Sequence, residues 1–167
     1  LAMQPGLSLC AVSDRAMEKA ATVKNRGWYL NFSKMEKHRT TNSTHATPII
    51  GLIYALDFQL QRILDAGIEN RYARHTAMAK MTREWVENNS QLSLYAPEGY
   101  RSNTVTSVEH GGKVDFKDLS KFLLSNDMRI ANGYTKIKPH TMRFGHMGEL
   151  TTDDISELLA VLDKYFS

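Results

Sequence analysis

Cysteine is almost absent from this chain, and long apolar runs and dense basic stretches are missing altogether. The single cysteine of the 167 residues, Cys10, cannot form a disulfide within the chain, and its apolar neighbours predict a small buried side chain. No apolar run approaches the ~18 residues of a membrane-spanning helix. No signal peptide is recognisable, so the cytoplasm is the expected compartment.

Nucleic-acid binding and several catalytic classes are also disfavoured. The 21 basic residues are scattered among 18 acidic ones, without the basic stripe of a nucleic-acid surface. The six histidines include no pair four residues apart, so no metal site is predicted. The chain has no Gly-x-Ser-x-Gly elbow, no Gly-x-Gly-x-x-Gly turn and no Walker loop. Any catalytic or binding site must therefore be sought in less specific sequence patterns.

What is present is an alternation of short apolar runs and amphipathic helices. The spacing of apolar residues predicts a buried strand over residues 7–12 and a polar, functional or mobile loop over 33–47. Helices are predicted over residues 14–24, 48–67, 68–88 and 116–124, and from Thr151 to the C-terminus. Strand-like runs follow at residues 92–95, 104–108, 128–130 and 141–144. This order favours a small antiparallel sheet covered on one side by helices.

Arg143 is the most informative residue, because it closes a short apolar run and precedes two glycines, Gly145 and Gly148. The planar guanidinium offers a two-pronged donor that matches a carboxylate, and glycines let the backbone approach a ligand closely. Arg143 is therefore a candidate carboxylate-binding residue. The alternative is a surface arginine paired with a nearby acid.

The polar loop before the predicted helix at Pro48 is a second candidate site. Ser43, Thr44 and Thr47 carry hydroxyl groups just ahead of a helix N-terminus, where the helix dipole favours negative charge. The simpler interpretation is that Thr47 caps the helix.

Three stretches together resemble the class V aminotransferases, a group of fold-type I enzymes that use pyridoxal phosphate (PLP). Residues 1–7 are similar to the Pro-Gly segment after the family's Schiff-base lysine, and residues 42–56 to its Thr/Pro loop and following helix. Residues 143–148 resemble its Arg-x-Gly-x-x-Gly segment. The similarity runs from end to end, and the order and spacing of the motifs carry it.

The resemblance implies an α/β enzyme, with an α+β arrangement in this part of it. Residues 1–66 would be the tail of the large cofactor-binding domain, and residues 67–167 the small C-terminal domain. It also implies a homodimer with active sites at the subunit interface. The substrates would be a small amino acid such as serine or alanine and a 2-oxo acid such as glyoxylate or pyruvate.

The resemblance also assigns site residues. Arg143 would bind the substrate carboxylate, and Thr44, with Thr47 and Ser43, would contact the PLP phosphate held by the other subunit. Some relatives have a tyrosine near Ser43 and a threonine near Ala46, so this loop departs from that version of the pattern.

The Schiff-base lysine, the ring-stacking residue and the acid that protonates the pyridine nitrogen have no counterpart in the chain, and no catalytic residue is assigned. Because such enzymes need that lysine, the chain alone is predicted not to transfer amino groups. With its abrupt apolar start, we expect a fragment of an enzyme. The alternative is a non-catalytic module for dimerisation or partner binding.

Overall fold

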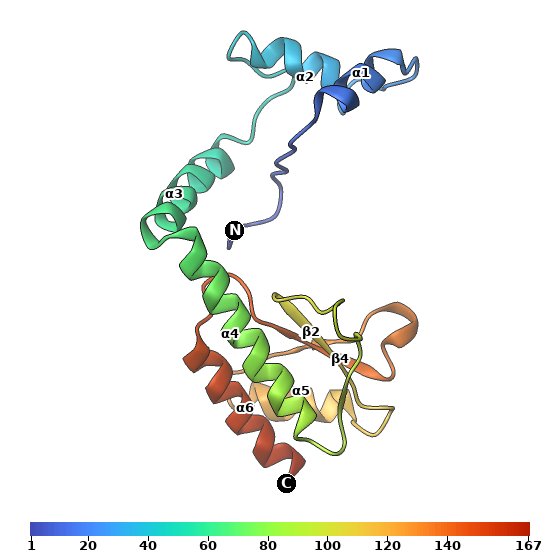
Figure 1. Cartoon of the computed structure of the whole chain (residues 1–167), viewed down its shortest axis with the longest axis vertical. Coiled ribbons are helices and arrows are strands. Elements are labelled where there is room, and N and C mark those ends of the chain that lie inside the picture. Colours follow the sequence, from blue (N-terminus) through green and yellow to red (C-terminus); the bar gives the residue numbers. More distant parts are fainter. The chain divides into compact units, whose positions relative to one another are not determined.

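The computed structural model describes all residues from Leu1 to Ser167 (Figure 1). Its elements, in chain order, are α1 (Asp14–Thr22), α2 (Phe32–Arg39), α3 (Ile50–Ala66), α4 (Ile68–Glu87), β1 (Ser93–Leu94), β2 (Val105–Glu109), α5 (Phe116–Leu124), β3 (Ala131–Asn132), the 3-10 helix η1 (Thr135–Ile137), β4 (Thr141–Gly145) and α6 (Thr152–Phe166). Contacts divide the chain into two compact units, Met3–Leu60 and Gln61–Ser167 with Leu1–Ala2. No helix is both long and apolar enough to cross a membrane.

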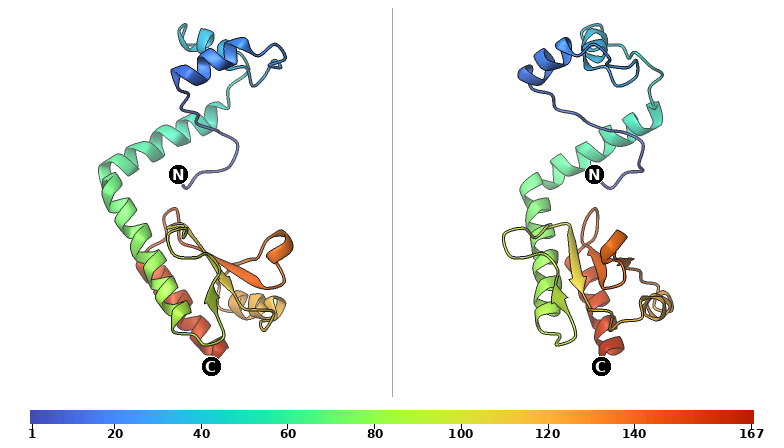
Figure 2. Two further views of the ribbon diagram at one scale, coloured as in Figure 1. Left: turned by 45° about the vertical axis from the view of Figure 1, so that its right-hand side comes forward. Right: turned by 90° about the vertical axis from the view of Figure 1, so that its right-hand side faces the viewer.

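The larger unit contains a four-stranded sheet in the order β1-β2-β4-β3, with every neighbouring pair antiparallel. Helices α4 and α6 run side by side along one face of it, as both views in Figure 2 show. Four strand residues that alternate along β2 and β4 are buried, namely Thr106, Val108, Met142 and Phe144. The predicted sheet covered on one side by helices is therefore confirmed.

Local signals account for the helix ends in this unit. Asp115 accepts hydrogen bonds from the backbone N–H groups of the first turn of α5. Thr151 and Asp154 form a capping box at the start of α6, in which each side chain bonds to the other residue's backbone N–H. These contacts satisfy donors that helix geometry leaves without partners.

The core of the unit joins the helices to the sheet. Trp85 of α4 lies with its ring centroid 5.9 Å from that of Phe144 and 5.9 Å from that of Phe166. Met78, Leu123 and Leu162 are fully buried in the same cluster. Burial of this apolar surface is the main stabilisation of such a layer.

The smaller unit corrects three predictions. Residues 7–12 form no strand, and Leu9 is 63% exposed, because no other strand of the chain pairs with this segment. Cys10 is likewise exposed rather than buried.

The third correction concerns the polar segment predicted as one long loop, which contains α2. The side chain of Asn31 accepts a hydrogen bond from the N–H of Lys34 and caps this helix. Arg39 donates two hydrogen bonds, both 2.7 Å long, to the carboxylate of Glu36 one turn earlier. These short-range contacts form a helix that has no apolar face and no buried residue.

Candidate functional site

Arg143 lies in the middle of β4, on the face of the sheet opposite the helices. Its neighbours Met142 and Phe144 point into the core, so strand alternation directs Arg143 to the other face. On β2 its antiparallel partner is Ser107, and on β3 it is Ala131. The side chain is half-buried, and its backbone belongs to β4, which pairs with a strand on each side.

The guanidinium of Arg143 has one hydrogen bond within the chain. Its Nε–H donates to the carbonyl oxygen of Asn132 at 2.8 Å. The central carbon lies 5.8 Å from the ring centroid of Tyr134. No carboxylate of the chain forms an ion pair with it, which excludes the alternative of a nearby intrachain acid. The terminal nitrogens have no hydrogen bond within the chain, and two such nitrogens match the two oxygens of a carboxylate.

The segment after Arg143 is held by a fully buried histidine. The Nδ1 of His146 lies 3.0 Å from the carbonyl oxygen of Asn103, and its Nε2 lies 2.7 Å from the hydroxyl of Thr106. Because a carbonyl only accepts, Nδ1 carries the proton and Nε2 accepts from Thr106. Burial lowers the pKa of His146 below its ordinary value, and the positive charge of Arg83 acts in the same direction. The ring is therefore neutral near pH 7.

Two arginines of α4 bind the turn that follows. Arg71 and Arg74 donate to the carbonyl oxygen of Gly148 at 3.1 and 2.8 Å. Gly148 has φ +73°, a conformation that other residues adopt only with strain. Arg71 also forms an ion pair with Glu149 at 3.1 Å. The motif's second glycine thus allows a turn whose carbonyl faces the helix.

The predicted phosphate loop lies in the smaller unit. Thr44 and Thr47 line a shallow hollow together with Trp28, His45, Ala46 and Pro48. Neither threonine hydroxyl has a hydrogen bond within residues 1–167. Ser43 differs, because its hydroxyl lies 2.9 Å from His38 Nδ1 and 2.9 Å from the hydroxyl of Thr41.

The N-capping interpretation of Thr47 is wrong. Helix α3 begins at Ile50 rather than at Pro48, and its first turn forms through backbone bonds to Pro48 and Ile49. Thr47 is consequently too far from the helix end to cap it. The hydroxyls of Thr44 and Thr47 therefore line one hollow without a partner in the chain.

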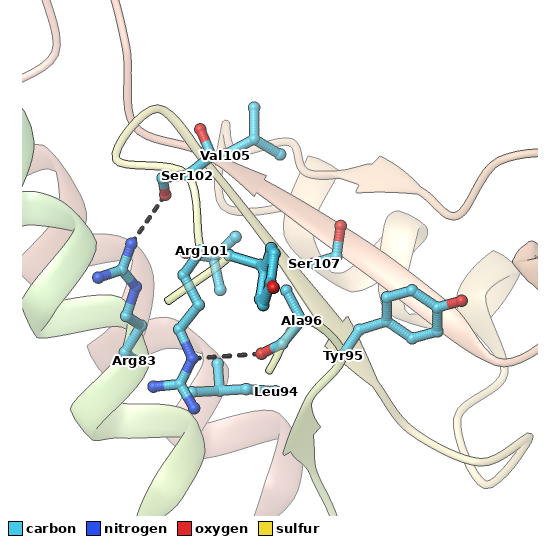
Figure 3. A pocket seen from close by; sticks show the side chains of 10 residues that line it. Arg83, Leu94, Tyr95, Ala96, Arg101, Ser102, Val105 and Ser107 are labelled. Atoms are coloured by element: carbon cyan, nitrogen blue, oxygen red, sulfur yellow. Dashed lines mark hydrogen bonds between the residues drawn. The ribbon is translucent and has the colours of Figure 1, made fainter. Parts of the chain in front are cut away.

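The larger unit has a cavity of about 220 Å³ between the end of β1 and the start of β2, lined in part by Arg83, Arg101 and Ser107 (Figure 3). Arg101 donates to the carbonyl of Ala96 at 3.2 Å and pairs with Glu87 at 3.3 Å. Arg83 donates to the carbonyl of Ser102 at 2.8 Å. These two arginines hold the loop around the cavity in place, and Arg143 is not among the residues that line the cavity.

No group of three or more His, Cys, Asp or Glu side chains in the chain could hold a metal ion.

Solved aminotransferase structures share this fold. Alanine–glyoxylate aminotransferase from Nostoc sp. matches with a TM-score of 0.80 and 28% identity, over 93% of this chain and 42% of that one. Pyridoxamine–pyruvate aminotransferase from Mesorhizobium loti matches with a TM-score of 0.79 and 26% identity, over 92% and 40%. The fold is that of the C-terminal part of such aminotransferases.

Sequence relatives support the same family. An uncharacterized aminotransferase of Methanocaldococcus jannaschii is 35% identical over 98% of this chain and 43% of its own length. A soluble hydrogenase 42 kDa subunit of Anabaena cylindrica is 30% identical over 95% and 41%. L-aspartate–glyoxylate aminotransferase of Paracoccus denitrificans is 30% identical over 89% and 38%. No protein-family model matches the chain.

The relatives and structural neighbours of the chain are aminotransferases, among them alanine–glyoxylate and serine–glyoxylate ones, and the predicted resemblance is confirmed. The chain spans between 38% and 43% of the length of the relatives named above.

Sequence analysis did not identify the neighbours of Arg143. Asn132 and Tyr134 carry no motif, and only the pairing of β3 with β4 places them beside the guanidinium. His146 lies within the segment 143–148, but nothing in the sequence indicated that its ring is buried and bonded to Asn103 and Thr106. Arg143 and the threonine loop lie in different units, and the assigned role of each remains a prediction.

Proposed function

We propose that the chain is the C-terminal part of a PLP-dependent aminotransferase that acts on small amino acids and 2-oxo acids. The observation that carries the proposal is the Arg143 guanidinium, which has its Nε committed to Asn132, no acidic partner, and two terminal nitrogens free. Relatives named for serine, alanine and glyoxylate, and a solved structure named for pyruvate, support serine or alanine as donor and glyoxylate or pyruvate as acceptor.

In this proposal Arg143 binds the α-carboxylate of the amino acid through its two terminal nitrogens. Two parallel hydrogen bonds fix both the position and the orientation of the carboxylate. The substrate's Cα is then held in one place relative to the cofactor, which lowers the entropic part of the barrier. When bound, PLP supplies the electron sink for proton removal at Cα.

Thr44 and Thr47 would contribute hydroxyl groups to the cofactor phosphate. Their hydroxyls have no partner within the chain and line one hollow, which fits an anion with several acceptor oxygens. Ser43 fits less well, because its hydroxyl already contacts His38 and Thr41.

The domain boundary at residues 66 and 67, the homodimer and the cytoplasmic compartment remain predictions. The alternative of a non-catalytic module has no observation in its favour, since the relatives are mostly named as aminotransferases.

The direct test is Arg143→Ala in the complete protein that carries this chain. Loss of a buried, charge-assisted carboxylate contact costs about 2–5 kcal/mol, so kcat/KM should fall roughly 30-fold or more. Arg129→Ala is the matched control, because Arg129 is exposed and has no hydrogen bond or ion pair within the chain. A change within a few-fold at Arg143 would refute the carboxylate role.

A further inference from the structure

Tyr134 lies beside the guanidinium of Arg143 without belonging to the core. Its ring centroid is 5.8 Å from the central guanidinium carbon, within range of a cation–π contact. The side chain is 68% exposed, so burial in this unit does not account for its position. The ring approaches the same guanidinium whose Nε–H is held by Asn132.

The backbone around Tyr134 is tightly constrained. Gly133 is buried and donates its N–H to the carbonyl of Thr141 at 2.9 Å. A Cβ at this glycine would meet the Thr141 carbonyl oxygen at 2.7 Å and the Lys138 backbone at 2.8 Å, so no side chain fits. On the other side, Thr135 has φ +48°, in the left-handed region. Such strain persists only where the surrounding structure holds it.

We propose that Tyr134 is a positioning residue for Arg143, and that this segment presents its ring to hold the guanidinium plane for a carboxylate ligand. The ring restricts rotation of the guanidinium about its stem, while Asn132 takes the Nε–H. The two terminal nitrogens are then preorganised for a small amino acid or 2-oxo acid. This inference rests on the proposed carboxylate role of Arg143.

The effect belongs to substrate binding rather than to proton transfer. In the complete protein, Tyr134→Leu should raise KM for the amino acid roughly 2- to 5-fold, the range of an exposed cation–π contact, and leave kcat nearly unchanged. Tyr134→Phe keeps the ring and should retain the wild-type KM. The inhibition constant of propanoate, a carboxylate that cannot react, should rise by the same factor in Tyr134→Leu only.

The matched control is Tyr100→Leu, which removes an 83% exposed tyrosine from another loop of the same unit. It should leave KM and the propanoate inhibition constant unchanged. Equal values for Tyr134→Leu and Tyr134→Phe, or an equal rise in Tyr100→Leu, would overturn the inference. If the wild-type protein transfers amino groups, Arg143→Ala does not, and the Tyr134 variants give one of these contrary results, only the inference about Tyr134 is overturned. An unchanged Arg143→Ala would instead overturn the proposed function.

Discussion

The Nε–H of Arg143 donates to the carbonyl oxygen of Asn132 at 2.8 Å, across the β3–β4 pair. The bond uses a guanidinium donor that a carboxylate bound to the two terminal nitrogens does not need. The acceptor is a backbone carbonyl, which a side-chain substitution at position 132 does not remove. The arginine is thus anchored by the sheet itself.

Arg143→Lys tests whether the shape of the guanidinium, with its two parallel donors, contributes to activity beyond its positive charge. Lysine keeps the charge but cannot form two parallel bonds to a carboxylate or donate through an Nε–H. A lost bond to a charged group is worth about 1.5–3 kcal/mol, so kcat/KM in the complete protein should fall roughly 10- to 100-fold. Arg129→Lys should have no effect. A fully active Arg143→Lys would mean that charge alone suffices.

Thr44→Val and Thr47→Val test the phosphate loop. Each removes one free hydroxyl while keeping the shape, and the dissociation constant of PLP from the complete protein should rise roughly threefold to tenfold. Equilibrium dialysis measures this constant directly. Thr40→Val is the control, because the Thr40 hydroxyl is already bonded to the Lys37 carbonyl. Unchanged PLP binding in both valine variants would remove these threonines from the site.

Residues 1–167 by themselves should not transfer amino groups when PLP, an amino donor and glyoxylate are added. The resemblance to the family assigns the Schiff-base lysine to none of the lysines of this chain. The measurement is oxo-acid formation by a coupled dehydrogenase assay, with the complete protein as the positive control. Sustained turnover by the chain alone would contradict the prediction.

The stability of the protein should fall as the pH drops below neutrality. Burial lowers the pKa of His146 in the folded state, and burial also lowers that of His110, with His140 adding to the effect. An unfolded histidine titrates near ~6.5, so below that pH the unfolded chain binds more protons than the folded one. This contribution is therefore complete above the unfolded pKa and is lost as the pH falls from there through the lowered pKa of the folded state.

Urea unfolding at pH 7.5 and pH 5.0 measures this dependence through the transition midpoint. His146→Phe should be less stable at pH 7.5, because Asn103 and Thr106 lose their partner, and its midpoint should vary less with pH. A wild-type midpoint that is the same at both pH values would show that neither histidine is protonated on unfolding.

Thr151→Ala should destabilise the protein by about 1 kcal/mol, the usual value of a helix N-cap. The Thr151 hydroxyl accepts from the N–H of Asp154, and the same two residues complete the capping box of α6. Chemical denaturation measures the change. Ser156→Ala, on the exposed side of the same helix, should be neutral or slightly stabilising. Equal stability of the two variants would mean that packing alone holds α6.

The sequence by itself determined the features that depend on neighbouring residues. Ser13, Asp115 and Thr151 are capping residues, and the helices begin after them as predicted, because capping requires only contacts within one turn. The aminotransferase resemblance rested on the order of short motifs, and the comparisons confirm it.

Only the tertiary structure decided which segments pair. Residues 7–12 have the composition of a strand but lack a partner in this chain, whereas β3 forms at Ala131–Asn132, one residue beyond the predicted run. Strand pairing depends on residues far away in the sequence, so periodicity cannot specify it. The same pairing brings Asn132 and Tyr134 to Arg143, which is why the sequence identified the arginine and the fold supplied the groups that hold it.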